Sequence, residues 1–445
     1  MLRPKPVVGA LIIILSIVGL ISPAFAQDES GQAIFGILQV DDENGDRVFV
    51  EGVVVSVDGV GEATSDAEGA FSIPVPEAGT YPVTLDESTL PEGVSLRTVG
   101  RNTLEILVEA DQDKRVLFAL TVGEGIEAGT NTGAAISGKR IAQLTAEGLK
   151  QGLYLAMASI GLSLIYGTTG LVNFAHAELV TWGGISTYFF NTWGFAGVAG
   201  FMAGWVAPFG SGAPLVLAVI LSVISGGILG YLLDRFLFRI LRKQGVSLIA
   251  QMVITIGLSI LMRYLYLYFF GGGPRTYREF TTQQAMSIGP VDVTPKDLIA
   301  MGISVIVLVG IGFLLNTTRV GKAMRAVSDN RDLAESSGID VQKVISTVWI
   351  YGAAAATLGG AFFALDQTKW DFGFRTLLLI FASVTLGGLG TAYGALVGAL
   401  LIGLVINLST LFLDPELKNM IALLAMVLVL MFRPQGLLGK AERIG

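Results

Sequence analysis

Long runs without a charged residue dominate the chain from residue 139 onward. The two longest have 55 and 38 residues. A helix needs only about 20 residues to cross the hydrocarbon core of a bilayer, so these runs must fold back on themselves. Apolar and polar residues alternate too weakly for a membrane barrel of strands, so helices are expected. Roughly eight to ten membrane segments are predicted, from the charge-free stretches 151–177, 179–233, 244–262, 298–318, 344–365 and 376–413 and the apolar stretch 419–432.

Residues 27–120 follow a different pattern, in which short apolar segments are separated by turn residues. Turn pairs such as Asn44-Gly45 and Asp58-Gly59 lie between segments that alternate or are rich in β-branched and aromatic residues. The string at 63–83 resembles the pattern of carboxypeptidase-regulatory-like sandwich domains, which implies a fold rather than an activity. The segment is therefore predicted to be a small all-β sandwich, with strands near 33–40, 52–57, 70–75, 79–85, 104–108 and 115–120.

The first 26 residues are typical of an export signal. Arg3 and Lys5 precede a short apolar stretch, and Ala24-Phe25-Ala26 fits a cleavage site. An uncleaved anchor helix is the alternative, and both interpretations place residue 27 onward outside the cytoplasm. A segment rich in Gly, Ala, Thr and Asn then suggests a flexible linker. The expected order is a signal peptide at 1–26, the sandwich at 27–120, a linker at 121–146, a membrane domain at 147–433 and a cytoplasmic tail at 434–445.

Composition and charge support this division. The chain is 52% hydrophobic and 15% charged, below the roughly 25% charged residues of ordinary soluble proteins. Residues 27–130 hold 21 acidic and 5 basic residues, whereas 131–445 hold 15 and 22. The net charge of −7 argues against a nucleic-acid partner. The excess of basic residues in cytoplasmic loops places 271–297 outside and puts three basic segments in the cytoplasm, 235–243, 317–343 and 433–443.

Little in the sequence suggests catalysis. The chain has no cysteine and a single histidine, His176, which excludes disulfides and thiolate metal sites. It lacks the Gly-x-x-x-x-Gly-Lys-Ser/Thr phosphate loop, so it is not expected to hydrolyse ATP itself. Neither an enzyme nor a cofactor is therefore expected. The acidic residues within 41–46 could bind calcium, but a solvated hairpin loop is favoured because the EF-hand spacing is absent.

Two segments interrupt the membrane pattern. Asn173, His176 and Glu178 follow a pair of glycines and a pair of threonines within 166–178, and a second glycine-rich break lies at 385–394. Polar groups and broken helices at membrane depth often border a transport path. The alternative is structural: Asn173 would cap a helix after a connecting turn, and the glycines of the second break would allow close helix packing.

The basic loop 318–340 predicts two short amphipathic helices with Gly338 at a break. Such a loop could dock in a groove of a cytoplasmic partner or lie at the lipid headgroups. The residue patterns alone leave both possibilities open.

Four motifs together resemble the branched-chain amino acid permease family of ABC transporters. They are Asn-Phe-Ala-His at 173–176 with Glu178, the loop from 319 to Ile339, the glycine break at 387–390 and the tail at 432–439. Order and spacing agree from about 147 to 440. Two features depart from the family: Ala177 stands where glycine is usual, and typical members lack an exported sandwich domain.

This resemblance implies the permease subunit of an importer in a bacterial inner membrane. The implied partners are two cytoplasmic ABC ATPases, a sister permease in a heterodimer, an external substrate-binding protein and membrane lipid. It also implies a translocation path bordered by Asn173, His176, Glu178, Gly387, Gly388 and Gly390, and an ATPase-coupling element containing Arg319, Gly321, Arg325, Ala334, Glu335, Gly338 and Ile339.

Branched-chain amino acids are the main expected substrates, with urea or short-chain amides as the alternative. Two hypotheses from other functional classes remain. One is a receptor or scaffold that uses the sandwich, and the other is an intramembrane enzyme that uses His176 and Glu178.

Overall fold

The computed structural model divides the chain into two units, one within Ala24–Ile136 and one within Ser137–Gly445. The predicted signal segment and the acidic residues 42–46 lie outside the described residues. The structure describes residues 33–41, 47–77, 79–96, 98–100, 102–108, 114–116, 118–123, 126–127, 138–193, 212–277, 279, 285–413, 417–433 and 435–439.

The N-terminal unit is built from two main sheets around one apolar core. The first sheet has the order β10-β7-β4-β5 and the second β11-β1-β6. Alternate residues of their strands point inward, so that Ile34, Val55 and Val83 are completely buried in one shared cluster. The strands of the two sheets are β1 (Ala33–Ile37), β4 (Val54–Val57), β5 (Gly61–Thr64), β6 (Ala70–Pro74), β7 (Gly79–Leu85), β10 (Thr103–Val108) and β11 (Lys114–Val116). Smaller elements are the pairs β2 (Gln39–Asp41) with β3 (Arg47–Phe49), β8 (Val94–Leu96) with β12 (Leu120–Val122) and β9 (Thr98–Val99) with β13 (Ile126–Glu127), and the short helix η1 (Glu87–Thr89).

The motif that suggested a sandwich has a clear structural role in the turn between β5 and β6. The Asp66 side chain accepts hydrogen bonds from the backbone N–H groups of Glu68 and Ala70, at 3.1 and 2.7 Å. Gly69 has φ of +70°, and a Cβ there would lie 2.3 Å from the carbonyl oxygen of Leu38. Aspartate and glycine are thus required by the turn itself. The predicted small all-β sandwich is confirmed.

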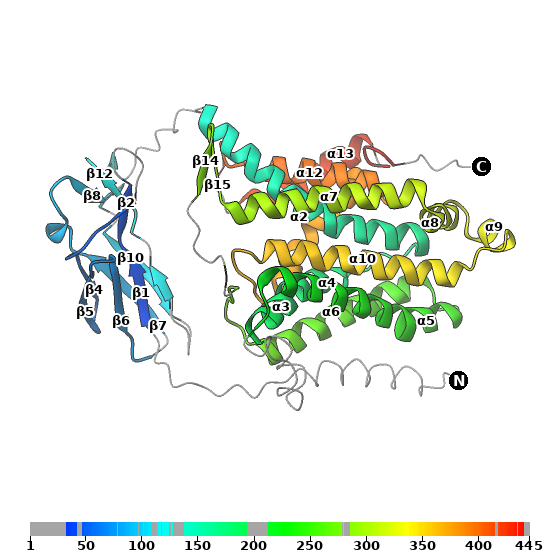
Figure 1. The fold of residues 1–445 in the computed structure, drawn as a ribbon, viewed down its shortest axis with the longest axis horizontal. Helices are drawn as coiled ribbons and strands as arrows, with labels where there is room; N and C mark the ends of the chain where they lie inside the picture. The colour runs from blue at the N-terminus through cyan, green and yellow to red at the C-terminus, as the bar shows by residue number, and fades with distance from the viewer. Residues whose placement is uncertain are drawn as a thin grey trace. The chain divides into compact units, whose positions relative to one another are not determined.

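The second unit is a bundle of helices (Figure 1). Six helices among the described residues are long and apolar enough to cross a membrane: Gly138–Thr169, Leu215–Lys243, Leu248–Phe270, Pro295–Thr317, Val341–Phe363 and Ala392–Ser409. Two shorter apolar helices, Phe372–Gly387 and Met420–Phe432, accompany them. The predicted helical multi-pass architecture is therefore confirmed. The helices are α2 (Gly138–Thr169), α3 (His176–Trp193), α4 (Leu215–Leu233), a π-helical turn η3 (Asp234–Phe238), α5 (Arg239–Lys243), α6 (Leu248–Phe270), α7 (Pro295–Thr317), α8 (Arg319–Asp329), α9 (Arg331–Ser336), α10 (Val341–Phe363), α11 (Phe372–Gly387), α12 (Ala392–Ser409) and α13 (Lys418–Phe432).

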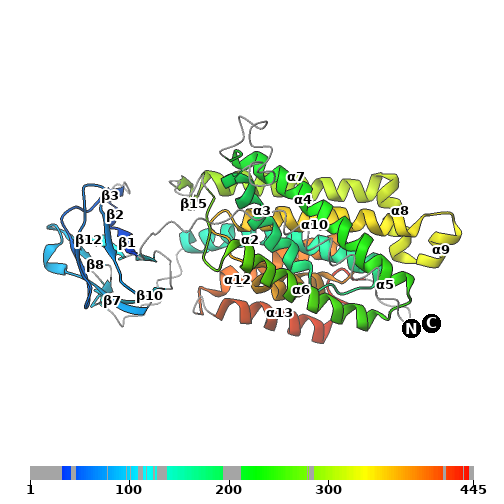
Figure 2. The same ribbon diagram turned by 90° about the horizontal axis from the view of Figure 1, so that it is seen from below.

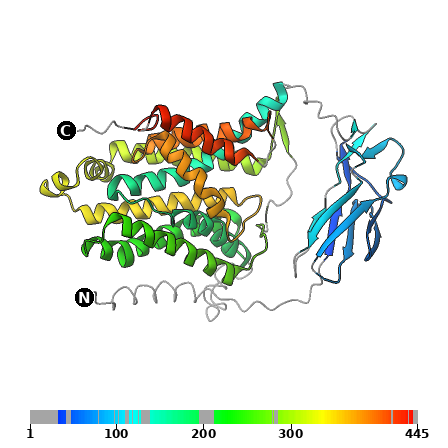
Figure 3. The same cartoon turned by 180° about the vertical axis from the view of Figure 1, so that it is seen from behind.

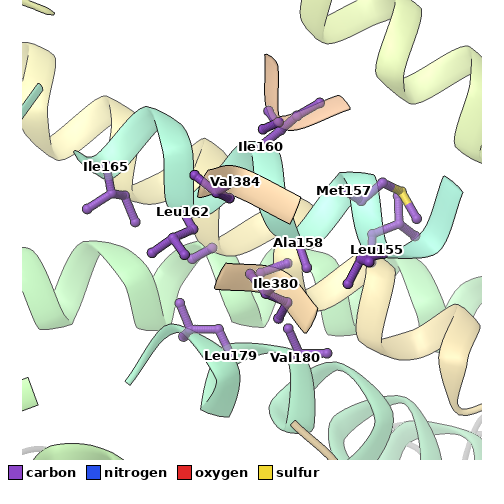
Figure 4. Packing of buried hydrophobic residues seen from close by; sticks show 14 of the residues in the cluster. Leu155, Met157, Ala158, Ile160, Leu162, Ile165, Leu179, Val180, Ile380 and Val384 are labelled. Carbon is purple, nitrogen blue, oxygen red and sulfur yellow. The ribbon is translucent and has the colours of Figure 1, made fainter. Parts of the chain in front are cut away.

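Helices α2 and α10 form the centre of the bundle. Their apolar windows are 78% and 72% buried, against 22% for α7 and 28% for α6. Figure 4 shows α2 side chains such as Leu162 packed toward Leu179 and Val180 of α3 and Ile380 and Val384 of α11. The central helices are also the least hydropathic, because small residues replace bulky ones where backbones approach.

The bundle has two distinct ends (Figures 1 and 2). The short helices α5, α8 and α9, which contain many of the basic residues, lie at one end. The hairpin of β14 (Met286–Ile288) and β15 (Val291–Val293) lies at the other, beside the start of α2. Seen from behind, α13 lies alongside α12 (Figure 3). This separation is the arrangement that the distribution of charge predicts.

Helix α2 begins at Gly138, inside the stretch 121–146 that the sequence suggested was a linker. Its first turns are anchored by Gln143. That side chain accepts a hydrogen bond from the N–H of Asp292 at 2.8 Å and donates to the carbonyl oxygen of Asp292 at 3.0 Å. Pairing with the β14–β15 hairpin thus stabilises helical turns whose composition resembles that of a linker.

Candidate functional site

The first site segment joins α2 to α3 within the bundle. Helix α2 ends at Thr169, and Gly170 takes φ of +69° while its N–H donates to Tyr166 O at 2.7 Å. Helix α3 starts at His176, whose Nε2 lies 2.9 Å from the carbonyl oxygen of Ala158. Because Ala158 precedes the end of α2 by about three turns, α3 begins in the interior of the bundle rather than at its end. The helical path is therefore interrupted between α2 and α3 inside the bundle.

Asn173 stabilises this break. Its side-chain oxygen accepts the N–H of Ala175 at 3.0 Å, and its carbonyl accepts the N–H of His176 at 3.2 Å. Only 1% of Asn173 is exposed, and His176 is completely buried. Within this chain both residues therefore make structural contacts just before and at the start of α3, and the Asn173 side chain bonds the turn that leads into the helix.

Glu178 is the centre of a polar network between three helices. Its carboxylate accepts hydrogen bonds from Ser259 at 3.0 Å, from Thr181 at 3.2 Å and from Arg263 Nε at 3.4 Å. Thr181 in turn accepts the N–H of Gly373 at 3.0 Å. The network joins α3 to α6 and α11, and the Glu178 side chain is completely buried. Buried charges persist only when they are paired and hydrogen-bonded, as here.

Replacing Glu178 with alanine is expected to destabilise the bundle, because it leaves Arg263 without its carboxylate partner. Removing one member of a buried ion pair costs about 3–5 kcal/mol. The measurement is the midpoint temperature of unfolding of the full chain in detergent. Lys139→Ala is the control: this ammonium pairs with Asp292 at 3.7 Å, and both side chains are exposed, at 68% and 42%, so its loss should change the midpoint little. Equal midpoints for the two variants would show that the Glu178 pair is not a structural link.

The second glycine break fixes the C-terminal tail and the end of α2. Gly388 and Gly390 take φ of +114° and +79°, values that favour glycine. The N–H groups of Leu437 and Leu438 donate to the carbonyls of Leu386 and Gly387 at 2.8 and 2.9 Å. A Cβ on Gly167 of α2 would lie 3.0 Å from the Gly390 carbonyl oxygen. The break is thus a junction of three segments that are far apart in the sequence.

A cavity of about 600 Å³ opens beside this junction, between the end of α2, helix α8 and the start of α12. It brings Gly390, from the proposed path, next to Arg325, from the proposed coupling element. The other polar groups of its lining are Tyr166, Thr168, Asn316, Ser328, Asp329, Thr391 and Tyr393.

The predicted coupling loop forms two capped helices. Thr318 Oγ1 accepts the N–H of Gly321 at 3.0 Å to begin α8, and Asn330 Oδ1 accepts the N–H of Leu333 at 3.0 Å to begin α9. Gly338 then takes φ of +85°, and the N–H of Ile339 donates to the carbonyl of Ala334 at 3.1 Å. These caps account for Thr318, Asn330 and Gly338 of the loop.

Six of the seven predicted coupling residues are either buried or exposed, and Ile339 is half-buried. Gly321 and Ala334 are buried, and a Cβ on Gly321 would lie 2.2 Å from the carbonyl oxygen of Leu314. Arg319, Arg325 and Glu335 are exposed. The buried residues determine how α8 and α9 pack, and the exposed side chains remain accessible to a partner. Leu333, which sequence reasoning missed, is 63% exposed on α9; its signal is an apolar residue inside a short polar helix.

Two further charged residues were missed because they border charge-free runs and looked like the ends of membrane segments. Arg263 lies within α6 and pairs with Glu178. Asp234 is completely buried at the π-helical turn, where it accepts hydrogen bonds from Arg242 at 2.6 Å and Ser346 at 2.5 Å. Neither the burial of Asp234 nor the inward turn of Arg263 can be recognised without knowing which helices pack against them.

The fold and the site together define a multi-pass membrane protein with glycine-broken helices and an exposed two-helix element at its basic end. A sequence model described as "Branched-chain amino acid transport system / permease component" matches residues 144–430. The chain belongs to this family of transport permeases.

Curated relatives support this assignment. The high-affinity branched-chain amino acid transport system permease protein BraD of Pseudomonas aeruginosa is 25% identical over 309 residues, which cover 67% of this chain and 96% of that protein. LivH of Escherichia coli is 25% identical over 305 residues, covering 66% and 94%. LivM of Escherichia coli is 25% identical over 307 residues, covering 63% and 66%. No solved structure matches the chain.

Proposed function

We propose that this chain is the permease subunit of an ATP-driven importer of branched-chain amino acids. The observation that supports this most directly is the exposed α8–α9 element at the basic end of a bundle that matches the permease family over residues 144–430. Arg319, Arg325 and Glu335 of this element are open to a cytoplasmic partner. The chain would therefore form the path and receive its energy from separate subunits.

Two ABC ATPases in the cytoplasm are the proposed partners of the α8–α9 element. A sister permease is proposed to complete the path, since the chain is similar both to LivH and to LivM, which are named as permease proteins of one kind of transport system. An external binding protein would deliver the substrate. The proposed topology puts α5, α8 and α9 in the cytoplasm and the N-terminal sandwich outside, because the basic residues gather at that end of the bundle.

The path itself is proposed to run along the glycine junction and the broken helix. Gly390 lines the cavity that Arg325 also borders, and the buried Gly387 and Gly388 hold the backbone behind it in close contact with Gly394 and Gly439. Asn173, His176 and Glu178 hold the broken start of α3 in place and so determine the shape of the path rather than its surface. The cavity connects this junction with the coupling element, so a movement of α8 would change it.

Uptake by the assembled transporter tests the proposal. The full chain, its sister permease, the ATPases and the binding protein are expressed in cells that lack their own branched-chain amino acid uptake. Labelled leucine should accumulate only when the chain is present and ATP can be hydrolysed.

Uptake of urea or a short-chain amide in place of leucine would assign the alternative substrate class. A chain that co-purifies with no ATPase and supports no uptake would contradict the proposal and favour a receptor or scaffold. Turnover of a substrate by the purified chain alone would point to an intramembrane enzyme.

Deleting residues 27–130 in the same cells tests the sandwich. If the sandwich docks the external binding protein, deletion should raise the concentration of binding protein needed for half-maximal uptake; if it contacts the cell envelope instead, that concentration should not change. Unchanged uptake at every concentration would make the sandwich an accessory domain.

A further inference from the structure

Arg263 is a charged residue inside a membrane-spanning helix. It lies about 10 Å from the Phe270 end of α6, at 1.5 Å per residue. A charge at this depth is costly and usually faces a cavity or a polar partner. Its Nε donates to Glu178 and its Nη2 to Ser259, both at 3.4 Å. The side chain therefore turns toward the bundle instead of extending along the helix to the membrane surface.

The guanidinium of Arg263 nevertheless remains accessible. Its side chain is 14% exposed, whereas the Glu178 side chain is completely buried. The guanidinium carbon lies 3.6 Å from the ring centroid of Phe374, and Phe374 is itself 48% exposed. One face of the guanidinium is thus covered by an aromatic ring, and part of the group reaches the surface of the chain. A guanidinium cannot face hydrocarbon without a large penalty, so this surface borders water or another polar group.

We propose that Arg263 lines the substrate path and that its guanidinium binds the carboxylate of the amino acid in transit. This inference rests on the proposed function. The planar guanidinium matches a carboxylate in geometry and charge, and charge-assisted hydrogen bonds of this kind are strong. Glu178 is a positioning residue, because it is buried and holds Arg263 toward Phe374 without reaching the surface. Urea and short-chain amides have no carboxylate, so this arginine favours amino acids as the substrate class.

Aqueous access to this position can be measured independently of transport. The chain has no cysteine, so Phe374→Cys creates a single thiol beside Arg263 in the full chain. In the assembled transporter, a membrane-impermeant, negatively charged thiol reagent should label this cysteine, and leucine-loaded binding protein should slow the labelling during ATP turnover. Ile306→Cys on α7, where Ile306 is 71% exposed, is the control; it should stay unlabelled because that face meets lipid. A Phe374→Cys variant that does not react would overturn the proposal.

Uptake by charge variants separates binding from folding. At saturating leucine-loaded binding protein, Arg263→Gln should lower uptake per assembled complex about tenfold or more, and Arg263→Lys should lower it less. The double variant Glu178→Gln with Arg263→Gln removes the unpaired charge, so assembly should recover while uptake should not. Arg275→Gln, at an exposed arginine, should behave like the wild type.

The outcomes distinguish the role of Arg263 from the proposed function of the whole chain. A double variant that transports leucine at the wild-type rate would overturn the role of Arg263 alone. A wild-type complex that takes up no amino acid would overturn the proposed function. If neither Arg263→Gln nor the double variant assembles, the cysteine labelling decides.

Discussion

Replacing Gly387 with alanine is expected to abolish the folded bundle and with it all uptake. A Cβ on Gly387 would lie 1.8 Å from the carbonyl oxygen of Gly394, and a Cβ on Gly398 would lie 2.0 Å from that of Ser383. The backbones of α11 and α12 therefore touch at Gly387, and no flexible side chain can move aside. Overpacking in a core typically costs about 1–3 kcal/mol, and a clash with backbone should exceed that range. The junction that holds the C-terminal tail through Gly387 O would be lost as well.

The measurement is the amount of monodisperse full-length protein recovered from membranes in detergent, together with uptake. Gly257→Ala and Gly310→Ala are matched controls, since a Cβ at either glycine meets no atom within 4 Å. Both controls should be recovered at the wild-type level. Recovery of Gly387→Ala at that level would mean that α11 and α12 can separate at little cost, and the glycine break would then be a flexible joint.

The architecture could be predicted from the sequence because a bilayer imposes simple requirements on length and polarity. Charge-free runs of suitable length became helices, and the basic residues between them came together at one end of the bundle. The sandwich was predictable for a similar reason, since inward residues alternate along strands such as β6. Strand β5 was not predicted because Gly61–Thr64 contains no large apolar residue. Its position depends on the backbone hydrogen bonds that it makes with β4.

The candidate site was predictable only in part. Glycines that interrupt a helix and polar residues within an apolar run can be recognised in one sequence, and both break segments were found that way. Which polar residue meets which on another helix could not be foreseen, because Ser259 and Arg263, the partners of Glu178 on α6, are 81 and 85 residues away. Arg263 was overlooked because a charge at the end of an apolar run resembles a helix end. Contacts between helices, rather than local pattern, decide whether such a charge is at the surface or within the bundle.

Leu333 of α9 should be the residue on which ATPase docking depends most. Its side chain is 63% exposed, while the neighbouring Ala334 is 3% exposed and fixes the helix against the bundle. A large apolar side chain in a short, capped helix at the basic end is suited to fill a pocket of a cytoplasmic partner. Leu333→Asp should therefore separate the permease from its ATPases and reduce uptake by about 30-fold or more, the effect of losing roughly 2 kcal/mol or more at an interface hot spot.

The bundle should fold normally in this variant, because Leu333 buries little surface within the chain and the Asn330 cap involves only its backbone N–H. Three measurements belong together: the unfolding midpoint in detergent, co-purification of the ATPases and uptake of leucine. Ser336→Ala is the matched control, since the Ser336 hydroxyl is exposed and donates only to the carbonyl of Leu333 in the same helix, at 3.0 Å. Wild-type uptake by Leu333→Asp would show that the ATPases do not contact this face of α9, and docking would then have to rest on the exposed side chains of α8.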